Sequence, residues 1–299
     1  MDFVATLIAS PVGPRLDAAA LTRAGVAIGA AGAPAWLQAG VAADIPFAGH
    51  VLDDKRAIAA RAQAALGDIH ADVVVQPVRT RRKKLLLADM DSTIIGQECI
   101  DELADYAGLK DHVAAITERA MRGEIEFAPA LRERVALLEG LPIEVADEVL
   151  ASRITLNPGA ATLVRTMRRH GAYTCLVSGG FTLFTHAVAR MAGFDEDRAN
   201  TLIIEDGRFA GRVREPILGR EAKLETLTAL RAARGLAHAD TLVIGDGAND
   251  LGMIEDAGLG VAYHAKPAVA AAAAARIDHG DLTALLFAQG YRRDEFVTP

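Results

Sequence analysis

Two acidic side chains stand two positions apart directly after a short apolar run. Asp89 and Asp91 follow Leu85–Ala88. Two carboxylates at this spacing repel one another, and burying both without compensation costs free energy. A divalent cation removes that cost, and Mg²⁺ suits oxygen ligands where a phosphate completes its coordination. The same pair is also typical of an ordinary solvated turn, so it indicates a metal site only together with other groups.

A glycine-rich acidic turn follows a second apolar run, Leu242–Ile244. The segment Gly245–Asp250 holds two carboxylates and an amide, from Asp246, Asp250 and Asn249. Glycines let the backbone approach a ligand closely. The third glycine and the downstream spacing of a dinucleotide-binding fingerprint are missing, so that ligand class is not indicated. The alternative is a plain strand-to-helix turn that Asn or Asp caps.

A hydroxyl and two glycines end a third apolar run. Ser178, Gly179 and Gly180 follow Tyr173–Val177. A hydroxyl together with backbone N–H groups that enter a helix forms an anion site. Gly-Gly is also common in plain turns. Lys223, inside a helical pattern further on, is by itself typical of a solvated surface lysine.

Apolar runs that alternate with helical patterns predict an α/β fold for the section that carries these groups. Their continuous apolar character indicates strands buried on both faces, and hence a parallel sheet covered by helices. In such sheets the ligand site lies beyond the carboxyl ends of the strands, so the three polar groups are expected at one edge. The expected strands are Leu85–Ala88, Tyr173–Val177, Leu242–Ile244 and Leu259–Ala262, and the expected helices include Ala160–Arg169, Phe181–Met191 and Ala222–Arg234.

The first two of these strands are separated by far more chain than one crossover needs. Residues 98–156 are mainly helical in pattern, and we expect them to form an inserted helical cap over the active edge of the sheet. The pair Asp206-Gly207 predicts a β-hairpin over Thr201–Val213. The alanine run Ala270–Ala275 is expected to be helical.

The chain before the sheet differs from it in charge. Residues 1–84 hold ten Lys or Arg and seven Asp or Glu, whereas the remaining 215 residues hold 22 and 32. We expect residues 1–78 to form a small α/β module and residues 85–299 to form the core. The basic run at 79–84 is expected to be a solvated linker whose charges keep the next strand from aggregating, with a nucleic-acid or targeting role as the alternative. The module's expected elements are strands Phe3–Ala9 and Asp72–Val78 and helices Leu16–Arg23 and Lys55–Leu66.

The overall composition is that of a mildly acidic globular protein. The formal charge of −7 argues against a general nucleic-acid partner. Cys99 and Cys175 cannot build a disulfide framework and fit a reducing compartment. Met1–Phe3 lacks the positive region of a secretory signal, and the uncharged stretch Ala24–Ala43 has too few large apolar side chains to enter a membrane. We therefore expect a cytoplasmic protein with no membrane or nucleic-acid partner.

The acid pair, Ser178–Gly180, Lys223 and Gly245–Asp250, taken in this order, resemble the four motifs of the haloacid dehalogenase superfamily. Within it, the chain from about Leu85 to Leu286 is similar to the phosphoserine phosphatase family. The resemblance implies a Rossmann-like parallel sheet with helices on both faces and an inserted helical cap, and the N-terminal module looks like a small ACT-type domain. The residues that carry the narrower resemblance are Asp89–Thr93, Gln97–Ile100, Met121, Phe127, Leu131–Val135, Val177–Phe181 and Gly245–Asp250.

This resemblance implies a role for each acidic residue of the core. Asp89 would be the nucleophile that becomes an aspartyl phosphate, and Asp91 the general acid and base. Mg²⁺ would be held by a carboxylate oxygen of Asp89, the backbone carbonyl of Asp91 and the carboxylate of Asp246. Asp250 would support the water shell of the metal and the side chain of Lys223.

The resemblance also implies the residues that bind the substrate. Ser178, the amide of Gly179 and Lys223 would hold phosphate oxygens, and Asn249 would orient the phosphate or the substrate. In the cap, Glu98 would bind the ammonium group of phosphoserine and Arg134 its carboxylate. Phe127 and Met121 would close the apolar side of the pocket. Without the motif set, Glu98 is typical of a helix's first turn and Arg134 of a helix surface.

The function implied by the resemblance is Mg²⁺-dependent hydrolysis of O-phospho-L-serine to serine and phosphate, the last step of serine biosynthesis. The alternatives are a phosphotransferase or phosphatase of the same superfamily for another small phosphomonoester, and a non-enzymatic amino-acid sensor. The N-terminal module is expected to bind an effector, to dock on the core, or to form a homodimer.

Overall fold

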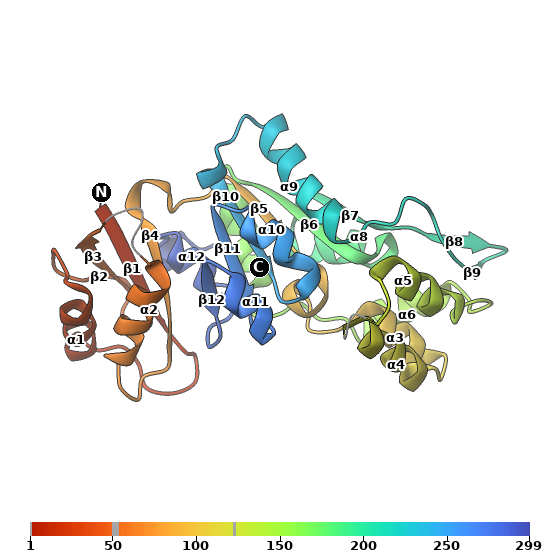
Figure 1. Ribbon diagram of the computed structural model, residues 1–299, viewed down its shortest axis with the longest axis horizontal. Coiled ribbons are helices and arrows are strands. Elements are labelled where there is room, and N and C mark those ends of the chain that lie inside the picture. Colours follow the sequence, from red (N-terminus) through yellow and green to blue (C-terminus); the bar gives the residue numbers. More distant parts are fainter. Residues whose placement is uncertain (1, 50–53, 122–123) are drawn as a thin grey trace.

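The computed structural model describes residues 2–49, 54–121 and 124–299, without the side chains of Glu118, Ala120 and Met121. From left to right in Figure 1, the chain forms an N-terminal module, a central sheet flanked by helices, and a helical cap. Short turns of helix at Val78–Thr80, Met90–Ile94, His238–Asp240, Ala248–Asp250 and Arg293–Glu295 connect the larger elements. Among the described residues, no helix combines the length and the apolar character needed to span a membrane.

The central sheet has six strands, and every neighbouring pair is parallel. This confirms the predicted parallel α/β core. The edge strands β7 and β12 were not predicted, and the helix expected over Ala270–Ala275 is wrong because it ends at Ala272 and a strand starts at Ala275. In spatial order the strands are β12 (Ala275–Ile277), β11 (Leu259–Tyr263), β10 (Thr241–Gly245), β5 (Leu85–Ala88), β6 (Tyr173–Phe181) and β7 (Glu196–Asn200).

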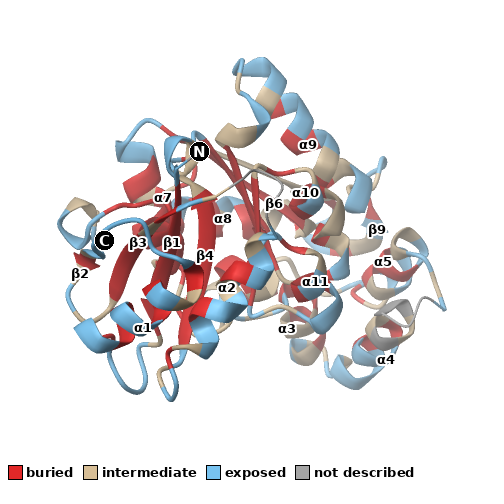
Figure 2. Cartoon of the chain, turned by 60° about the vertical axis from the view of Figure 1, so that its left-hand side comes forward, coloured by how far each residue is buried: buried red, intermediate tan, exposed pale blue. Residues whose placement is uncertain are grey.

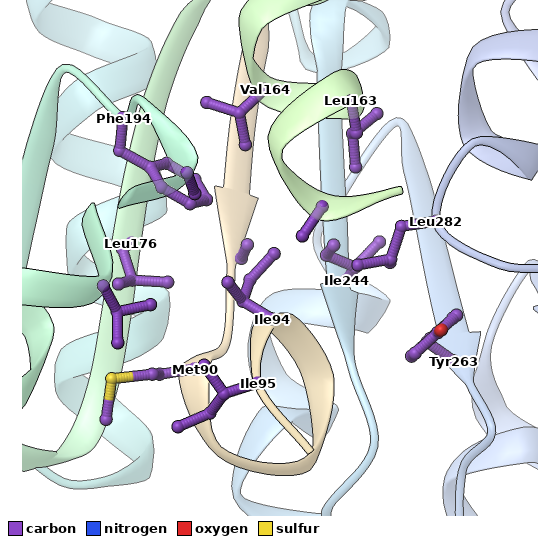
Figure 3. Close-up of a cluster of buried hydrophobic side chains, with 14 of the residues drawn as sticks. Met90, Ile94, Ile95, Leu163, Val164, Leu176, Phe194, Ile244, Tyr263 and Leu282 are labelled. Atoms are coloured by element: carbon purple, nitrogen blue, oxygen red, sulfur yellow. The ribbon is translucent and has the colours of Figure 1, made fainter. Parts of the chain in front are cut away.

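Helices cover both faces of this sheet, as its continuous apolar strands require. In β5, Leu86 and Ala88 join the core cluster on one face, whereas Leu85 and Leu87 join the cluster on the other. Figure 3 shows the first of these clusters, where Leu163 and Val164 of α7 lie near Leu176 of β6 and Ile244 of β10. Helices α7 (Ala160–Arg169), α8 (Thr182–Ala192) and α12 (Ala284–Ala288) pack on this face, and α9 (Arg220–Ala233), α10 (Leu251–Glu255) and α11 (Pro267–Ala272) on the other.

The N-terminal module is a four-stranded antiparallel sheet with two helices on one face (Figure 2). Two of its strands, β2 and β3, were not predicted, because they lie in the glycine- and alanine-rich section after α1. The opposite face of the sheet contributes Ile8, Leu37, Ala42 and Val74 to the core cluster that contains α12. The elements are β1 (Asp2–Ala9), α1 (Ala18–Ile28), β2 (Ala35–Gln38), β3 (Ala42–Ala48), α2 (Lys55–Ala64) and β4 (Ala71–Pro77).

The basic run between module and core is docked in part, so the prediction of a solvated linker is wrong for Arg81 and Lys83, whereas Arg79, Arg82 and Lys84 are exposed. Lys83 is buried, and its ammonium donates a 2.9 Å hydrogen bond to the carbonyl of Ala239. Burial lowers its pKa to about 8. Arg81 pairs with Asp44 of β3 at 2.6 Å, and the guanidinium of Arg82 lies 4.0 Å from the centre of the Tyr291 ring. These basic side chains therefore join the two parts of the molecule.

The cap follows the first strand of the core, where an insertion was expected. It contains α3 (Cys99–Tyr106), α4 (Lys110–Met121), α5 (Phe127–Ala136) and α6 (Glu144–Ser152). The predicted hairpin is present as β8 (Leu202–Glu205) and β9 (Arg208–Val213), and it extends from the core to the cap (Figure 1). Phe209 of β9 exchanges backbone hydrogen bonds with the cap at Gly140 and Leu141, both 2.8–2.9 Å long. The hairpin thus connects the cap to the core by backbone hydrogen bonds.

A buried carboxylate anchors the module to the core. Asp72 of β4 accepts backbone N–H groups from Asp278, His279 and Gly280 at 2.7–3.3 Å. Burial raises the pKa of Asp72, and these N–H groups oppose that rise. Since the three donors lie in the loop between β12 and α12, one side chain orders the core segment that faces the module.

We expect Asp72→Asn to weaken this anchor. The amide nitrogen would face a backbone N–H group, so a buried donor would lose its acceptor at a cost of about 2 kcal/mol. Urea unfolding of the full chain at neutral pH measures the change in the free energy of unfolding. Asp68→Asn, which removes the same charge at an exposed position, is the matched control. Equal effects of the two substitutions would contradict the anchoring role.

Candidate active site

The carboxyl ends of three neighbouring strands bring the predicted core residues together. Strand β5 pairs in parallel with β6 on one side and β10 on the other, so that Leu85 lies beside both Tyr173 and Thr241. Asp89 directly follows β5, Ser178 lies in the last part of β6, and Asp246 directly follows β10. The sheet register therefore places their side chains at one edge.

A buried ammonium lies at the centre of this edge. Lys223 of α9 is 1% exposed, and its Nζ lies 2.7 Å from Oδ1 of both Asp89 and Asp250. Burial alone would lower the pKa of Lys223, but the charges of the two aspartates outweigh it and raise the pKa. Lys223 was expected to bind phosphate oxygens. In the structure its ammonium lies at the same distance from Asp89, the expected nucleophile, and from Asp250 in the acidic turn.

Asp89 is held in a single orientation by its Oδ1 atom. That oxygen binds Lys223 and accepts the Met90 N–H at 2.8 Å. Its other oxygen, Oδ2, accepts no hydrogen bond from the part of the chain that the structure describes. The pKa of Asp89 is raised, first by burial and then by the charge of Asp250, while Lys223 opposes the rise. One oxygen is thus anchored, and the other is left for a ligand.

Asp250 is the support of the acidic turn. While its Oδ1 binds Lys223, its Oδ2 accepts the N–H groups of Asp246 and Gly247 at 3.2 and 3.1 Å. A side chain at position 245 would place Cβ 2.4 Å from the Asp250 carboxyl group, so Gly245 is needed for this close approach. With both oxygens engaged, Asp250 holds the turn that presents Asp246.

The chemistry of these donors fits a hard divalent cation. Carboxylate oxygens of Asp89, Asp246 and Asp250 lie within 4.8 Å of one another. The pKa of Asp246 is raised to about 6, first by burial and then by the charge of Asp250, although Lys266 and Lys223 act in the opposite sense. The nearby ammonium groups therefore leave part of the negative charge uncompensated. A cation with oxygen ligands compensates it, and the carboxylate of Asp246 lies outside the two contacts that Lys223 makes with Asp89 and Asp250.

Asp91 contacts Ser178, the residue before Gly179 and Gly180, and the start of the cap. Its Oδ2 accepts the Ser178 hydroxyl at 3.0 Å, and its Oδ1 accepts the N–H of Cys99, the first residue of α3, at 2.9 Å. The backbone between them turns at Ser92, which has a φ of 54°. The carboxylate of Asp91 therefore bridges the core strand β6 and the cap helix α3.

Glu98 and Arg134 bring the cap's charges to the same edge. The Glu98 carboxylate accepts the Ser92 hydroxyl at 2.7 Å, and its pKa is raised to about 7, first by burial and then by the charge of Asp91. Arg134 of α5 donates to the Ala130 carbonyl and to the Thr117 hydroxyl, each at 3.3 Å. Burial lowers the pKa of Arg134, and the charges of Asp101, Glu98 and Asp91 oppose this. The guanidinium thus faces acidic groups inside the site.

Phe127 of the cap packs on Gly179, in the Ser178–Gly180 segment of the core. A Cβ at Gly179 would lie 2.9 Å from the Phe127 ring, so the ring packs directly on the backbone of that glycine. Asn249 is half-buried in the acidic turn. Met121, expected beside Phe127, ends α4, and its side chain lies outside the described residues.

Three residues of the edge were not predicted individually. Thr93 donates to Asp246 at 3.3 Å, and Asn157 donates to the Thr93 carbonyl at 2.8 Å. Asn200, at the end of β7, joins Gly179 to Leu218 through hydrogen bonds of 2.7–3.0 Å. Asn157 stands before Pro158-Gly159, a turn signal in the sequence. No comparable signal marks Asn200, because β7 contains no apolar run.

Comparison with known proteins agrees with this arrangement of core and cap. The haloacid dehalogenase-like hydrolase family matches residues 86–255. The curated phosphoserine phosphatase of Streptomyces coelicolor is 43% identical over 85% of the chain, which spans 62% of that relative. The curated phosphoserine phosphatase of a Polaromonas species is 48% identical over 68% of the chain and 88% of the relative. The chain thus spans less than two thirds of the first relative and most of the second.

Solved structures extend the likeness to the whole fold. A HAD family hydrolase from Salmonella enterica superposes with a TM-score of 0.82 and 27% identity, covering 98% of this chain and 99% of that one. A phospho-aspartyl intermediate analogue of phosphoserine phosphatase superposes with a TM-score of 0.64 and 39% identity, covering 69% of this chain and 98% of that one. Since the matched family spans both the strand ends that carry the acidic groups and the inserted cap, the chain belongs to the haloacid dehalogenase-like hydrolases.

Proposed function

We propose that this hydrolase is a Mg²⁺-dependent phosphoserine phosphatase, which converts O-phospho-L-serine and water into L-serine and phosphate. The observation that carries the proposal is that Glu98 and Arg134 both lie within electrostatic range of Asp91, so an acidic and a basic side chain of the cap stand beside the core site. The core groups suit a phosphate ester of any kind, whereas an acid and a guanidinium beside them suit the ammonium and carboxylate of an amino acid. The relatives of the same name support this choice of substrate.

In the first step, Asp89 is the nucleophile. Its free Oδ2 attacks phosphorus, an aspartyl phosphate forms, and the bond between phosphorus and the serine oxygen breaks. The anchored Oδ1 keeps the carboxylate oriented, since Lys223 and the Met90 N–H both hold it. The departing serine oxygen takes a proton from Asp91, which lies beside Ser178 at the same edge.

In the second step, water replaces serine as the reacting group. Asp91 takes a proton from the water, the water oxygen bonds to phosphorus, and the bond to Asp89 breaks to release phosphate. The Ser178 hydroxyl and the N–H of Gly179 hold the phosphate oxygens through both steps, and Asn249 orients the phosphoryl group. Phe127 excludes bulk water, because its ring lies on Gly179.

The residues that would hold Mg²⁺ are Asp89, Asp246 and the backbone carbonyl of Asp91. When bound, the ion supplies positive charge that lets an anionic carboxylate approach a phosphate dianion. Asp250 keeps Asp246 in place because its Oδ2 accepts the N–H groups of Asp246 and Gly247, and its Oδ1 binds the ammonium of Lys223.

We expect Asp89→Asn to lower turnover of phosphoserine by several orders of magnitude. The amide keeps the size of the side chain but is a far weaker nucleophile. Phosphate release under saturating substrate and Mg²⁺ measures the effect. Asp206→Asn, in the exposed hairpin turn, removes the same charge and should leave turnover unchanged. Near-native turnover of Asp89→Asn would rule out the covalent mechanism.

Removal of divalent cations should abolish turnover, and Mg²⁺ should restore it. Excess Ca²⁺ should inhibit, because its larger and more flexible coordination disturbs in-line geometry. Asp246→Asn should raise the Mg²⁺ concentration needed for half-maximal turnover, since it removes one negative oxygen ligand. Full turnover in chelator, with elemental analysis finding no bound metal, would be incompatible with the proposed metal site.

Arg134→Ala should impair binding of the substrate carboxylate without impairing phosphate transfer itself. Loss of a charge-assisted bidentate pair lowers kcat/KM for phosphoserine by about a hundredfold. An aryl phosphate, which lacks the carboxylate, should lose far less. Arg134→Lys should recover little, because lysine lacks the planar fork.

The matched control is Arg132→Ala, two positions earlier on α5, where the guanidinium is exposed and pairs with Glu215 at 2.6 Å. It should leave kcat/KM unchanged on both substrates. If Arg134→Ala lowered kcat/KM equally for phosphoserine and the aryl phosphate, Arg134 would support the cap in general, and the assignment of phosphoserine would lose its basis.

A further inference from the structure

A cavity lies between the N-terminal module and the core, away from the residues assigned to catalysis. It has a volume of about 320 Å³. The module contributes the end of β1, the following loop and the turn between β2 and β3. The core contributes residues 280–287 and the C-terminal segment at 293–296. None of the residues proposed to react with, or bind, phosphoserine lines it.

Two guanidinium groups line this cavity from opposite parts of the chain. Arg15 comes from the module and Arg293 from the C-terminal segment. Neither forms an ion pair with a carboxylate anywhere in the described ranges, whereas the adjacent Arg292 lies 3.6 Å from Asp294. The third charged lining residue, Asp281, is already an acceptor for the N–H and hydroxyl of Thr283, at 2.8 and 2.5 Å. The lining therefore carries a net positive charge that faces the cavity from both sides.

The rest of the lining is largely apolar and aromatic. The rings of Phe287 and Phe296 lie 4.9 Å apart between centroids, and Ile8 and Ala284 extend the same surface. The Arg293 guanidinium lies 5.1 Å from the centre of the Phe296 ring, so charge and apolar surface adjoin. An inorganic anion would use only the guanidinium groups. A ligand that also has an apolar body would use both surfaces.

The walls of the cavity are fixed by backbone hydrogen bonds. On the core side, the Leu282 N–H binds the Pro158 carbonyl at 3.1 Å. On the module side, the Ala9 N–H binds the Val41 carbonyl at 2.8 Å, and the Leu16 N–H binds the Gly40 carbonyl at 3.0 Å. A site with fixed walls loses little entropy when a ligand binds.

We propose that this cavity is a second ligand site, which binds a small organic carboxylate with an apolar body. The carboxylate lies between Arg15 and Arg293, and the apolar body lies on Phe287 and Phe296. The volume is at the lower end of small-molecule pockets, which limits the ligand to the size of a small metabolite. The proposal does not depend on the substrate of the active site.

Benzoate is the probe, because it combines a carboxylate with one aromatic ring. We expect saturation-transfer NMR titration of the full chain to give a dissociation constant on the order of a millimolar. Benzamide, of the same shape but without charge, should bind at least about tenfold more weakly. Equal binding of benzamide would overturn the proposal. Displacement of benzoate by inorganic phosphate at equal concentration would overturn the assignment of an organic ligand.

Two substitutions locate the bound benzoate. Arg15→Gln and Arg293→Gln should each weaken binding by about tenfold or more, since each removes one charged donor from an exposed position. Arg292→Gln, next in the chain to Arg293 but outside the cavity, is the matched control and should leave binding unchanged. If Arg134→Gln abolished binding while Arg15→Gln and Arg293→Gln did not, benzoate would occupy the active site, and the proposal would be wrong.

Discussion

The buried contact of Lys223 with Asp89 and Asp250 is the constraint around which the core is organised. It joins α9, the end of β5 and the turn after β10 through two 2.7 Å contacts. Burying an ammonium or a carboxylate alone is costly, and each side chain here offsets the cost of the others. The same contact leaves one oxygen of Asp89 without a partner among the residues that the structure describes. Stability of the core and availability of the proposed nucleophile therefore come from one arrangement.

The central strands of the core could be predicted from the sequence, but its edges could not. Strands β5, β6, β10 and β11 are buried on both faces, and continuous apolar runs in the sequence indicate that burial. Strand β7 is an edge with five residues, four of them only half-buried, so no apolar pattern marks it. Strand β12 has three residues within an alanine-rich section, where helix propensity is high whatever the tertiary structure. The alanines there favour a helix, but the helix stops at Ala272 and the chain then pairs with β11 as a strand.

The site shows the same division between local pattern and tertiary context. Asp89, Ser178 and Asp246 follow apolar strands, and the topology of a parallel sheet is enough to bring them to one edge. The burial of Lys223 depends on where α9 packs against the sheet. The helical pattern of the sequence does not predict that position. Likewise, the basic run at 79–84 looks like a solvated linker, because its partners Asp44, Ala239 and Tyr291 are distant in sequence. Charge alone does not distinguish an exposed lysine from a docked one.

Asp91 links the position of the cap to the chemistry of the core. One of its oxygens accepts the first N–H of the cap helix α3, and the other accepts the hydroxyl of Ser178 in the core strand β6. A displacement of α3 would therefore change the environment of the residue assigned to proton transfer. Phe127 gives a second link, since its ring packs on Gly179 when the cap is in this position. The recognition proposed for Glu98 and Arg134 and the proton transfer proposed for Asp91 thus both depend on the position of the cap. Under the proposed mechanism, a substrate that holds the cap in place would also complete the surroundings of Asp91.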